Sequence, residues 1–222
     1  MDMKNYFIPR RTAIDLDDVV VSTVDVKTCA FAKNKMQPQP ISCWYVTDAP
    51  KEVRDDILHW FTSGKVTFGR PIDMRAIFHI NRMMANPNRF DVIITARPAK
   101  YKPQTYLQLA SYGLKIPYDR LFVVGVNVSK VDTMKDAYIK VLFDDKPKNI
   151  TEAHDNGIVG HLISSGNTLY NHEMRDSGTV PHSKKLMDAF RAYGIADPSA
   201  DIEYNIWNHN RQKMFDRLFN EK

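Results

Sequence analysis

Cysteine is scarce in this sequence. Cys29 and Cys43 are the two cysteines among its 222 residues. One optional bridge in a chain of this length does not make a disulfide framework. Neither cysteine has neighbours at the spacing of zinc ligands. We therefore expect two free thiols, and we exclude the class of small, disulfide-rich secreted domains.

Long hydrophobic runs, repeats and low-complexity tracts are missing as well. No apolar segment approaches the roughly 20 residues of a membrane-spanning helix. Residues 1–11 are polar and lack the apolar core of a signal peptide. The hydrophobic fraction of 43% is ordinary for a globular protein. These features predict a cytoplasmic protein without a membrane partner, built as one large domain or as a core domain with a smaller insert.

Charge is only mildly unbalanced, with a formal net charge of +5. Such an excess suits an anionic partner, either a small phosphate ester or a nucleic acid. The basic residues are scattered along the chain, which argues against a dedicated nucleic-acid surface. We therefore expect a small phosphate ester as the partner and keep nucleic acid as the less favoured alternative.

Short, continuous apolar runs are typical of strands that are covered on both faces. Five such runs are present: TAIDL (12–16), FDVIIT (90–95), LFVVGV (121–126), KVLFDD (140–145) and GHLISS (160–165). Helical patterns lie between them at 72–85, 103–114 and 129–138. This alternation predicts an α/β fold, a Rossmann-like parallel sheet with helices on both faces.

The stretch from residue 20 to residue 69 interrupts the alternation. It is rich in aromatic residues and contains a predicted helix at 50–61. We interpret 20–69 as a small, mainly helical cap inserted after strand one, and 1–19 together with 70–180 as the core domain.

Residues 181–222 are interpreted as a C-terminal helical extension packed on the core. One of its two predicted helices spans 202–219. The apolar stripe of that helix consists of Ile202, Ile206, Met214, Leu218 and Phe219. Packing against the core is the favoured role of this stripe, and a homodimer contact is the alternative.

Polar residues gather at one edge of the predicted sheet. They are Asp15 and Asp17 after the first strand, Thr95 after the second, Asp144 and Asp145 after the fourth, and Lys130 at the start of the preceding helix. Ligands bind at the carboxyl ends of the strands in such sheets. Facing carboxylates repel, so one must be protonated or a cation must lie between them. Mg²⁺ suits a site made of oxygen ligands.

The same residue types suit phosphoryl transfer. A carboxylate beside a metal ion can attack phosphorus. A second carboxylate two residues later can protonate the leaving oxygen and then activate water. The hydroxyl of Thr95 and the ammonium of Lys130 fit the charged oxygens of the phosphoryl group.

The motifs resemble those of the haloacid dehalogenase (HAD) superfamily of phosphohydrolases. DLDDV (15–19) resembles the first motif, VIITARP (92–98) the second, and SKVDTMKDAYIKVLFDDKPKNI (129–150) the third and fourth. The resemblance covers about residues 12–24 and 70–171, and leaves the insert and the tail unmatched.

The resemblance implies a role for each matched residue. Asp15 is the nucleophile and Asp17 the acid/base. The phosphoryl group is bound by Thr95 and Lys130, with Ala96 and Asp18 as further phosphate-binding residues and Lys135 as the rival of Lys130. Mg²⁺ is held by Asp15, the backbone carbonyl of Asp17 and one acid of the Asp144–Asp145 pair; we favour Asp145 as the direct ligand.

TARP (95–98) and NTLYN (167–171) look like the 5′(3′)-deoxyribonucleotidase branch of the superfamily. In that branch a cap after the first motif covers the site. Trp44, Trp60 and Phe61 are candidates for stacking on a base, or else they form the core of the cap. Arg97 either contacts phosphate or shapes the turn before Pro98. Asn171 either closes the site or caps a loop.

The favoured hypothesis is a Mg²⁺-dependent nucleotidase that hydrolyses (deoxy)nucleoside monophosphates. The alternatives are a phosphatase for the 3′ end of DNA or RNA, another small-molecule phosphatase of the superfamily, and a binding protein without catalysis. The basic residues Arg211, Lys213 and Arg217 motivate the end phosphatase.

Overall fold

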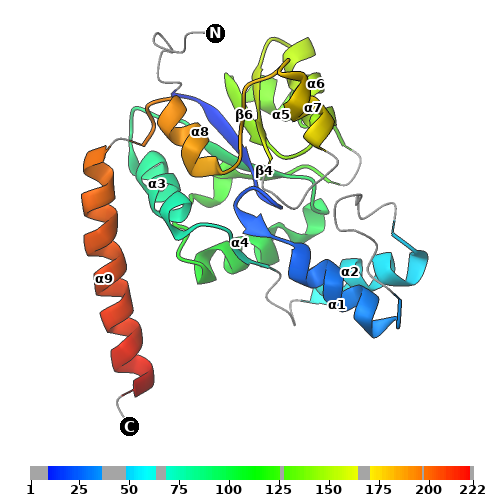
Figure 1. Ribbon diagram of the computed structural model, residues 1–222, viewed down its shortest axis with the longest axis horizontal. Coiled ribbons are helices and arrows are strands. Elements are labelled where there is room, and N and C mark those ends of the chain that lie inside the picture. Colours follow the sequence, from blue (N-terminus) through cyan, green and yellow to red (C-terminus); the bar gives the residue numbers. More distant parts are fainter. Residues whose placement is uncertain are drawn as a thin grey trace.

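The computed structural model describes residues 10–36, 49–63, 69–125, 128–164, 171–196 and 198–220. Its centre is a six-stranded parallel sheet with the strand order β5-β4-β1-β6-β7-β8 (Figure 1). The strands are β1 (Thr12–Asp15), β4 (Val92–Thr95), β5 (Leu121–Val123), β6 (Val141–Asp144), β7 (Val159–Ile163) and β8 (His182–Ser183). The five predicted strands are confirmed, and β8 is an addition to them.

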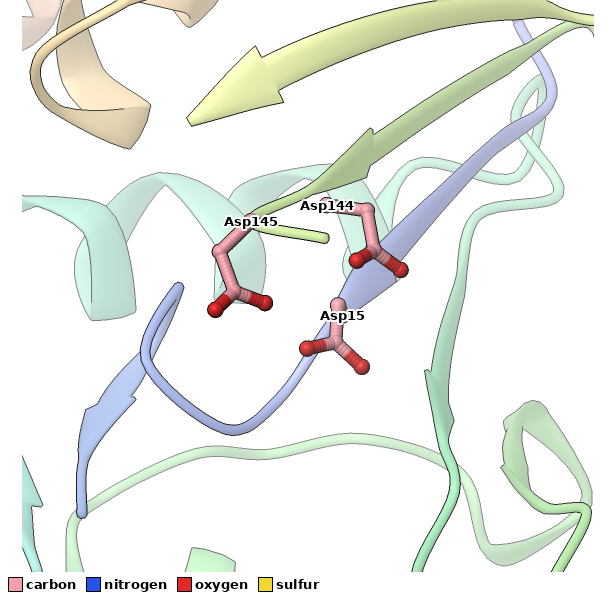
Figure 2. Close-up of side chains that lie close together, drawn as sticks. All are labelled: Asp15, Asp144 and Asp145. Carbon is pink, nitrogen blue, oxygen red and sulfur yellow. The ribbon is translucent and has the colours of Figure 1, made fainter. Parts of the chain in front are cut away.

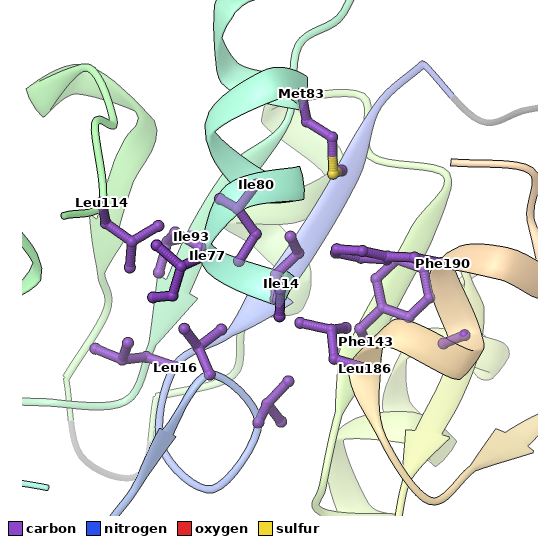
Figure 3. Packing of buried hydrophobic residues seen from close by; sticks show 14 of the residues in the cluster. Ile14, Leu16, Ile77, Ile80, Met83, Ile93, Leu114, Phe143, Leu186 and Phe190 are labelled. Atoms are coloured by element: carbon purple, nitrogen blue, oxygen red, sulfur yellow. The ribbon is translucent and has the colours of Figure 1, made fainter. Parts of the chain in front are cut away.

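Helices cover both faces of the sheet, as predicted. One face carries α3 (Met74–Ala85), α4 (Lys102–Ser111) and α8 (Leu186–Ala192), and the other carries α5 (Val131–Asp136) and α6 (Pro147–Asp155). In Figure 3, Ile14 of β1 lies between Ile80 of α3 and Phe190 of α8. Ala13 points the other way and packs with Met134 of α5. Successive residues of a strand point to opposite faces, so a fully buried strand needs the continuous apolar run seen in the sequence.

The strand register brings the polar strand ends together. Ile14 pairs with Ile93 of β4 and with Phe143 of β6. The strands are parallel, so the residues that follow on all three strands emerge at the same edge. This register places Asp15 between the end of β4 and the end of β6.

A tight coil follows β1. The carbonyl oxygen of Leu16 accepts hydrogen bonds from the amides of both Val20 and Val21. Asp18, within the coil, has a φ of 63°, in the left-handed region. Asp is one of the residues that tolerate this region, because its short side chain can bond locally. The coil turns the chain out of the sheet and into the insert.

The insert is small and mainly helical, as predicted. It begins and ends on a two-stranded antiparallel ribbon of β2 (Val21–Ser22) and β3 (Arg70–Pro71), and it contains α1 (Val24–Lys33) and α2 (Lys51–Ser63). The two helices pack on each other around Phe31 and Ile57. The insert therefore has a core of its own.

The C-terminal part contains α7 (His172–Ser177), β8, α8 and the long α9 (Pro198–Asn220). Figure 1 shows α9 beside α3 and extending past the sheet. Tyr204 and Trp207 of α9 pack against Phe78 of α3, with ring centroids 5.8 and 5.7 Å away. In contrast to the predicted stripe, Ile202 and Ile206 are exposed. Tyr204 and Trp207 make the contact instead.

The side chains of Met214, Leu218 and Phe219 lie outside the described part of the structure. Among the described helices, none combines the length and the apolar character that crossing a bilayer requires.

Candidate active site

Three buried carboxylates converge at the carboxyl edge of the sheet. Asp15 ends β1, Asp144 ends β6, and Asp145 follows Asp144. One oxygen of each lies within 4.8 Å of the other two (Figure 2). All three residues are at most 4% exposed. Burial of three acids side by side is costly unless positive charge compensates for it.

Lys130 supplies part of that positive charge. Its Nζ lies 2.5 Å from Asp15 Oδ1 and 2.6 Å from Asp144 Oδ2. Burial alone would lower the pKa of Lys130, but the two carboxylates outweigh burial and raise it. Lys130 stands directly before α5, where Ser129 Oγ accepts a hydrogen bond from the amide of Val131. The rival Lys135 is exposed and donates to Asn156 instead.

The acids still carry an excess of negative charge. Burial raises the pKa of Asp15 to about 7, with Asp144 and Asp17 adding to the rise and Lys130 opposing it. Burial, Asp144 and Asp15 raise the pKa of Asp145 well above its usual value. A divalent cation would relieve this repulsion, and carboxylate oxygens are the donors that Mg²⁺ prefers. Asp15, Asp144 and Asp145 thus fit the metal ion that the sequence implies.

Asp144 and Asp145 differ in their surroundings. Asp144 Oδ1 accepts from the backbone amide of Lys146, and both of its carboxylate oxygens accept from Asn149 Nδ2. These bonds, together with the bond from Lys130, fix the Asp144 side chain in one orientation. Asp144 is therefore held in place by its neighbours, and the choice of Asp145 as the direct metal ligand stays a prediction.

Asp17 lies at the mouth of this site, with a side chain that is 28% exposed. Its carboxylate accepts hydrogen bonds from Thr95 Oγ1, at 3.2 Å, and from the guanidinium of Arg97, at 2.7 and 3.1 Å. Burial would raise the pKa of Asp17, but Arg97 and the hydrogen bonds outweigh it, so the pKa is lowered. The structure brings Thr95 to the site and joins Arg97 to Asp17.

Asp18 has partners other than those that the resemblance implies. Its carboxylate accepts from the amide and hydroxyl of Thr23 and forms a buried ion pair with Lys27 Nζ at 3.0 Å. Its own amide donates to Val21. These contacts join the coil after β1 to helix α1 of the insert. The phosphate-binding role of Asp18 stays a prediction.

Solved structures of known proteins share this architecture. A hydrolase of the haloacid dehalogenase-like family from Streptococcus pneumoniae matches with a TM-score of 0.58 at 11% identity, covering 82% of this chain and 97% of the other. A protein from Clostridium acetobutylicum, described as a predicted phosphatase, matches with 0.57 at 15% identity, covering 83% and 98%. A protein from Bacillus subtilis, described as a HAD hydrolase bound to magnesium, matches with 0.50 at 11% identity, covering 84% and 99%.

The fold is HAD-like. No family model and no curated protein gives a significant match to the sequence. At these identities the solved structures establish the fold alone, and none of the three descriptions names a nucleotide. The activity must therefore be argued from the site that this HAD-like fold carries.

The remaining sequence-based candidates lie as follows. Ala96 is half-buried directly after β4. Asn171 is buried, and its Nδ2 lies 3.3 Å from the carbonyl oxygens of Asp145 and Ile163, which corresponds to the loop-capping alternative. Trp60 packs in the small core of the insert, so it corresponds to the cap-core alternative. Trp44 and the side chain of Phe61 lie outside the described residues.

Sequence reasoning missed one cation at the site. Lys146 follows the acidic pair and is half-buried. Burial would lower its pKa, but Asp145, Asp15 and Asp144 outweigh burial and raise it. Its position in the sequence, directly after two acids at a strand end, could have indicated that Lys146 lies at the site. Lys27 gave no such signal, since its buried ion pair depends on how α1 packs.

Proposed function

We propose that the protein is a Mg²⁺-dependent phosphomonoesterase that uses Asp15 as its nucleophile. The observation that carries this proposal is the convergence of Asp15, Asp144, Asp145 and Lys130 at the carboxyl edge of a HAD-like sheet, with Asp17 and Thr95 at its mouth. A buried cluster of this composition has a high electrostatic cost, and strongly perturbed acids of this kind are typical of functional sites.

Asp15 attacks the phosphorus atom of the ester. A bond forms between its carboxylate oxygen and phosphorus while the bond to the leaving oxygen breaks. The protonated form of Asp17 donates its proton to the leaving oxygen, and the carboxylate that results takes a proton from the water that hydrolyses the acyl phosphate. Lys130 and Thr95 bind the phosphoryl oxygens and stabilise the charge that they carry in the transition state.

Asp15, Asp145 and the Asp17 carbonyl would hold Mg²⁺, with Asp144 orienting them. When bound, the ion neutralises the carboxylates and favours the ionised form of Asp15. Lys146 adds positive charge at the same edge and favours an anionic substrate.

A (deoxy)nucleoside monophosphate is the substrate that we favour. The resemblance of the TARP and NTLYN segments to the deoxyribonucleotidase branch supports it, and so does an insert that enters and leaves the core beside the site. The end-phosphatase alternative has weaker support. The helix that carries Arg211, Lys213 and Arg217 lies across the molecule from the insert (Figure 1).

A substrate panel tests this proposal. We expect release of phosphate from nucleoside monophosphates with Mg²⁺, and none with excess chelator. Asp15→Asn should lower kcat at least about 10³-fold, while the matched change Asp136→Asn, at the far end of α5, should not. Phosphate release that survives Asp15→Asn would contradict the nucleophile. Turnover of sugar phosphates without turnover of nucleotides would contradict the substrate class alone.

A further inference from the structure

Arg97 holds Asp17 with two nitrogens of its guanidinium group. Nη2 lies 2.7 Å from Asp17 Oδ1, and Nε lies 3.1 Å from Oδ2. The Arg97 side chain is 5% exposed. A planar fork that binds both carboxylate oxygens fixes the plane and the direction of the carboxylate. The orientation of Asp17 therefore depends on the position of Arg97.

Gln108 of α4 holds Arg97 from behind. Arg97 Nη1 donates to Gln108 Oε1 at 2.6 Å, and Gln108 Nε2 donates to Tyr112 Oη at 3.0 Å. Residues four apart lie on the same side of a helix, so Gln108 and Tyr112 stand one above the other. The amide of Gln108 uses its oxygen toward Arg97 and its nitrogen toward Tyr112, which defines one orientation of the amide.

Tyr112 continues the chain of bonds to the base of the insert. Its Oη donates to the carbonyl oxygen of Gly69 at 2.6 Å. Gly69 precedes β3, the strand on which the insert returns to the core. Its φ is 74°, and a Cβ atom there would lie 2.0 Å from the carbonyl oxygen of Ser22. Gly69 is thus pressed against the outgoing strand of the same ribbon.

We propose that Arg97, Gln108 and Tyr112 are positioning residues that couple the orientation of Asp17 to the base of the insert. An unbroken series of hydrogen bonds connects the Asp17 carboxylate with the Gly69 carbonyl. A shift of the β2–β3 ribbon changes the anchor of Tyr112, and through Gln108 and Arg97 it changes where Asp17 points. The inference rests on the proposed role of Asp17 as acid/base.

The first test compares two kinds of leaving group. An alkyl phosphate needs a proton on its leaving oxygen, whereas p-nitrophenyl phosphate releases a stable anion and depends little on an acid. We expect Tyr112→Phe and Gln108→Leu to lower kcat/KM about tenfold for an alkyl phosphate, and less than about twofold for p-nitrophenyl phosphate. Their matched controls on α4 are Tyr106→Phe and Gln104→Leu, and these should change neither value.

A double-mutant cycle adds a second criterion. In an Asp17→Asn background, Tyr112→Phe should have no further effect on either substrate, because its effect passes through Asp17. An equal loss with both leaving groups, or a loss that persists in the Asp17→Asn background, would overturn the proposal, since either would indicate general damage to the structure.

Amide hydrogen exchange tests the coupling without any activity. The amide of Ile72 donates to Val20, and the amide of Val21 donates to Leu16. These bonds report on the ribbon and on the coil that carries Asp17. We expect Gln108→Leu to accelerate exchange of both amides at least about threefold, whereas Gln104→Leu should accelerate neither. Unchanged exchange would overturn the coupling. If Gln108→Leu accelerates the exchange of both amides but the wild type hydrolyses no phosphate ester, the coupling stands and the proposed function is overturned.

Discussion

Single residues at the carboxyl edge of the sheet carry both the proposed chemistry and its electrostatic cost. Asp145 is 1% exposed, and the neighbouring acids raise its pKa well above its usual value. The fold therefore places this acid where its ionised form is disfavoured. Replacement of Asp145 by a neutral side chain should stabilise the metal-free protein and weaken its response to the metal.

We predict that Asp145→Asn raises the free energy of unfolding by roughly 1 kcal/mol at pH 8 in a chelating buffer. Added Mg²⁺ should stabilise the wild type by mass action and should stabilise the variant far less. Urea unfolding with and without Mg²⁺ measures both effects. A variant that gains as much from Mg²⁺ as the wild type would show that Asp145 is not a ligand.

Lys27 is the buried partner of Asp18, and the two side chains are 7% and 9% exposed. We predict that Lys27→Met lowers the free energy of unfolding by about 3 kcal/mol, because it leaves the Asp18 carboxylate buried without its cation. The double variant Asp18→Asn/Lys27→Met should lose less than the sum of the single losses. Urea unfolding of the three variants provides the measurement. If the two single losses in unfolding free energy add up to the loss of the double variant, the two side chains do not stabilise each other.

At the scale of residues, the sequence predicted the positions of side chains at strand ends. It did not predict the contacts that depend on how turns and helices pack. Asp15, Thr95 and Asp145 could be placed because a strand end fixes the edge at which they emerge. The partners of Asp17 and Asp18 could not be placed in this way. Arg97 and Lys27 reach their acids through the packing of a turn and of helix α1, and no periodicity encodes that packing.

At the scale of elements, long apolar segments were predictable and short or polar ones were not. The strand β8 has two polar residues, His182 and Ser183, and joins the sheet through backbone hydrogen bonds beside β7. The helix α6 buries only Ile150 and Ala153. The strand β8 shows no apolar pattern in the sequence, and α6 offers only Ile150 and Ala153, three residues apart on one face. Such short patterns do not identify an element from the sequence alone.

The contact between β7, β8 and α8 contains a buried histidine. His161 of β7 packs between the rings of Phe143 and Tyr193, and its Nε2 lies 2.9 Å from Ser183 Oγ. Burial lowers the pKa of His161 to about 4, with His182 adding to the shift. An unfolded histidine titrates near 6.5. Between these values the unfolded chain binds a proton that the folded protein does not, so acid favours unfolding.

We predict that this contribution to stability is complete above pH 6.5 and is lost as the pH falls toward 4. The loss amounts to roughly 3 kcal/mol at most. His161→Gln should remove it, so the difference in unfolding free energy between wild type and variant should shrink from pH 7 to pH 4.5. Urea midpoints across this range measure the difference. A difference in unfolding free energy that stays constant across this pH range would contradict the lowered pKa of His161.

At the scale of the whole molecule, the insert and α9 attach to the sheet in different ways. The insert is joined through the β2–β3 ribbon, the Asp18–Lys27 pair and the Tyr112–Gly69 bond, all of them close to the site. The long helix α9 contacts α3 through Tyr204 and Trp207, away from the site. The contacts that the structure describes for α9 therefore lie away from the acidic edge of the HAD-like sheet.

We predict that a chain shortened to residues 1–197 keeps its kcat within about twofold, because none of the described side chains of α9 contacts the acidic cluster. Its melting temperature should fall by a few degrees, because Phe78 loses its aromatic partners. Calorimetry and a phosphatase assay on the shortened chain test both statements. A large loss of kcat would show that α9 supports the site.

Gly69 and Ser22 have a consequence for protein engineering. The outgoing and returning chains pass so close at this point that a side chain cannot fit between them. We therefore expect that the segment between these two passages can be replaced by another, provided that Lys27 is kept as the partner of Asp18. Such grafts would separate the contribution of the cap to the proposed choice of ester from the contribution of the sheet to its proposed cleavage.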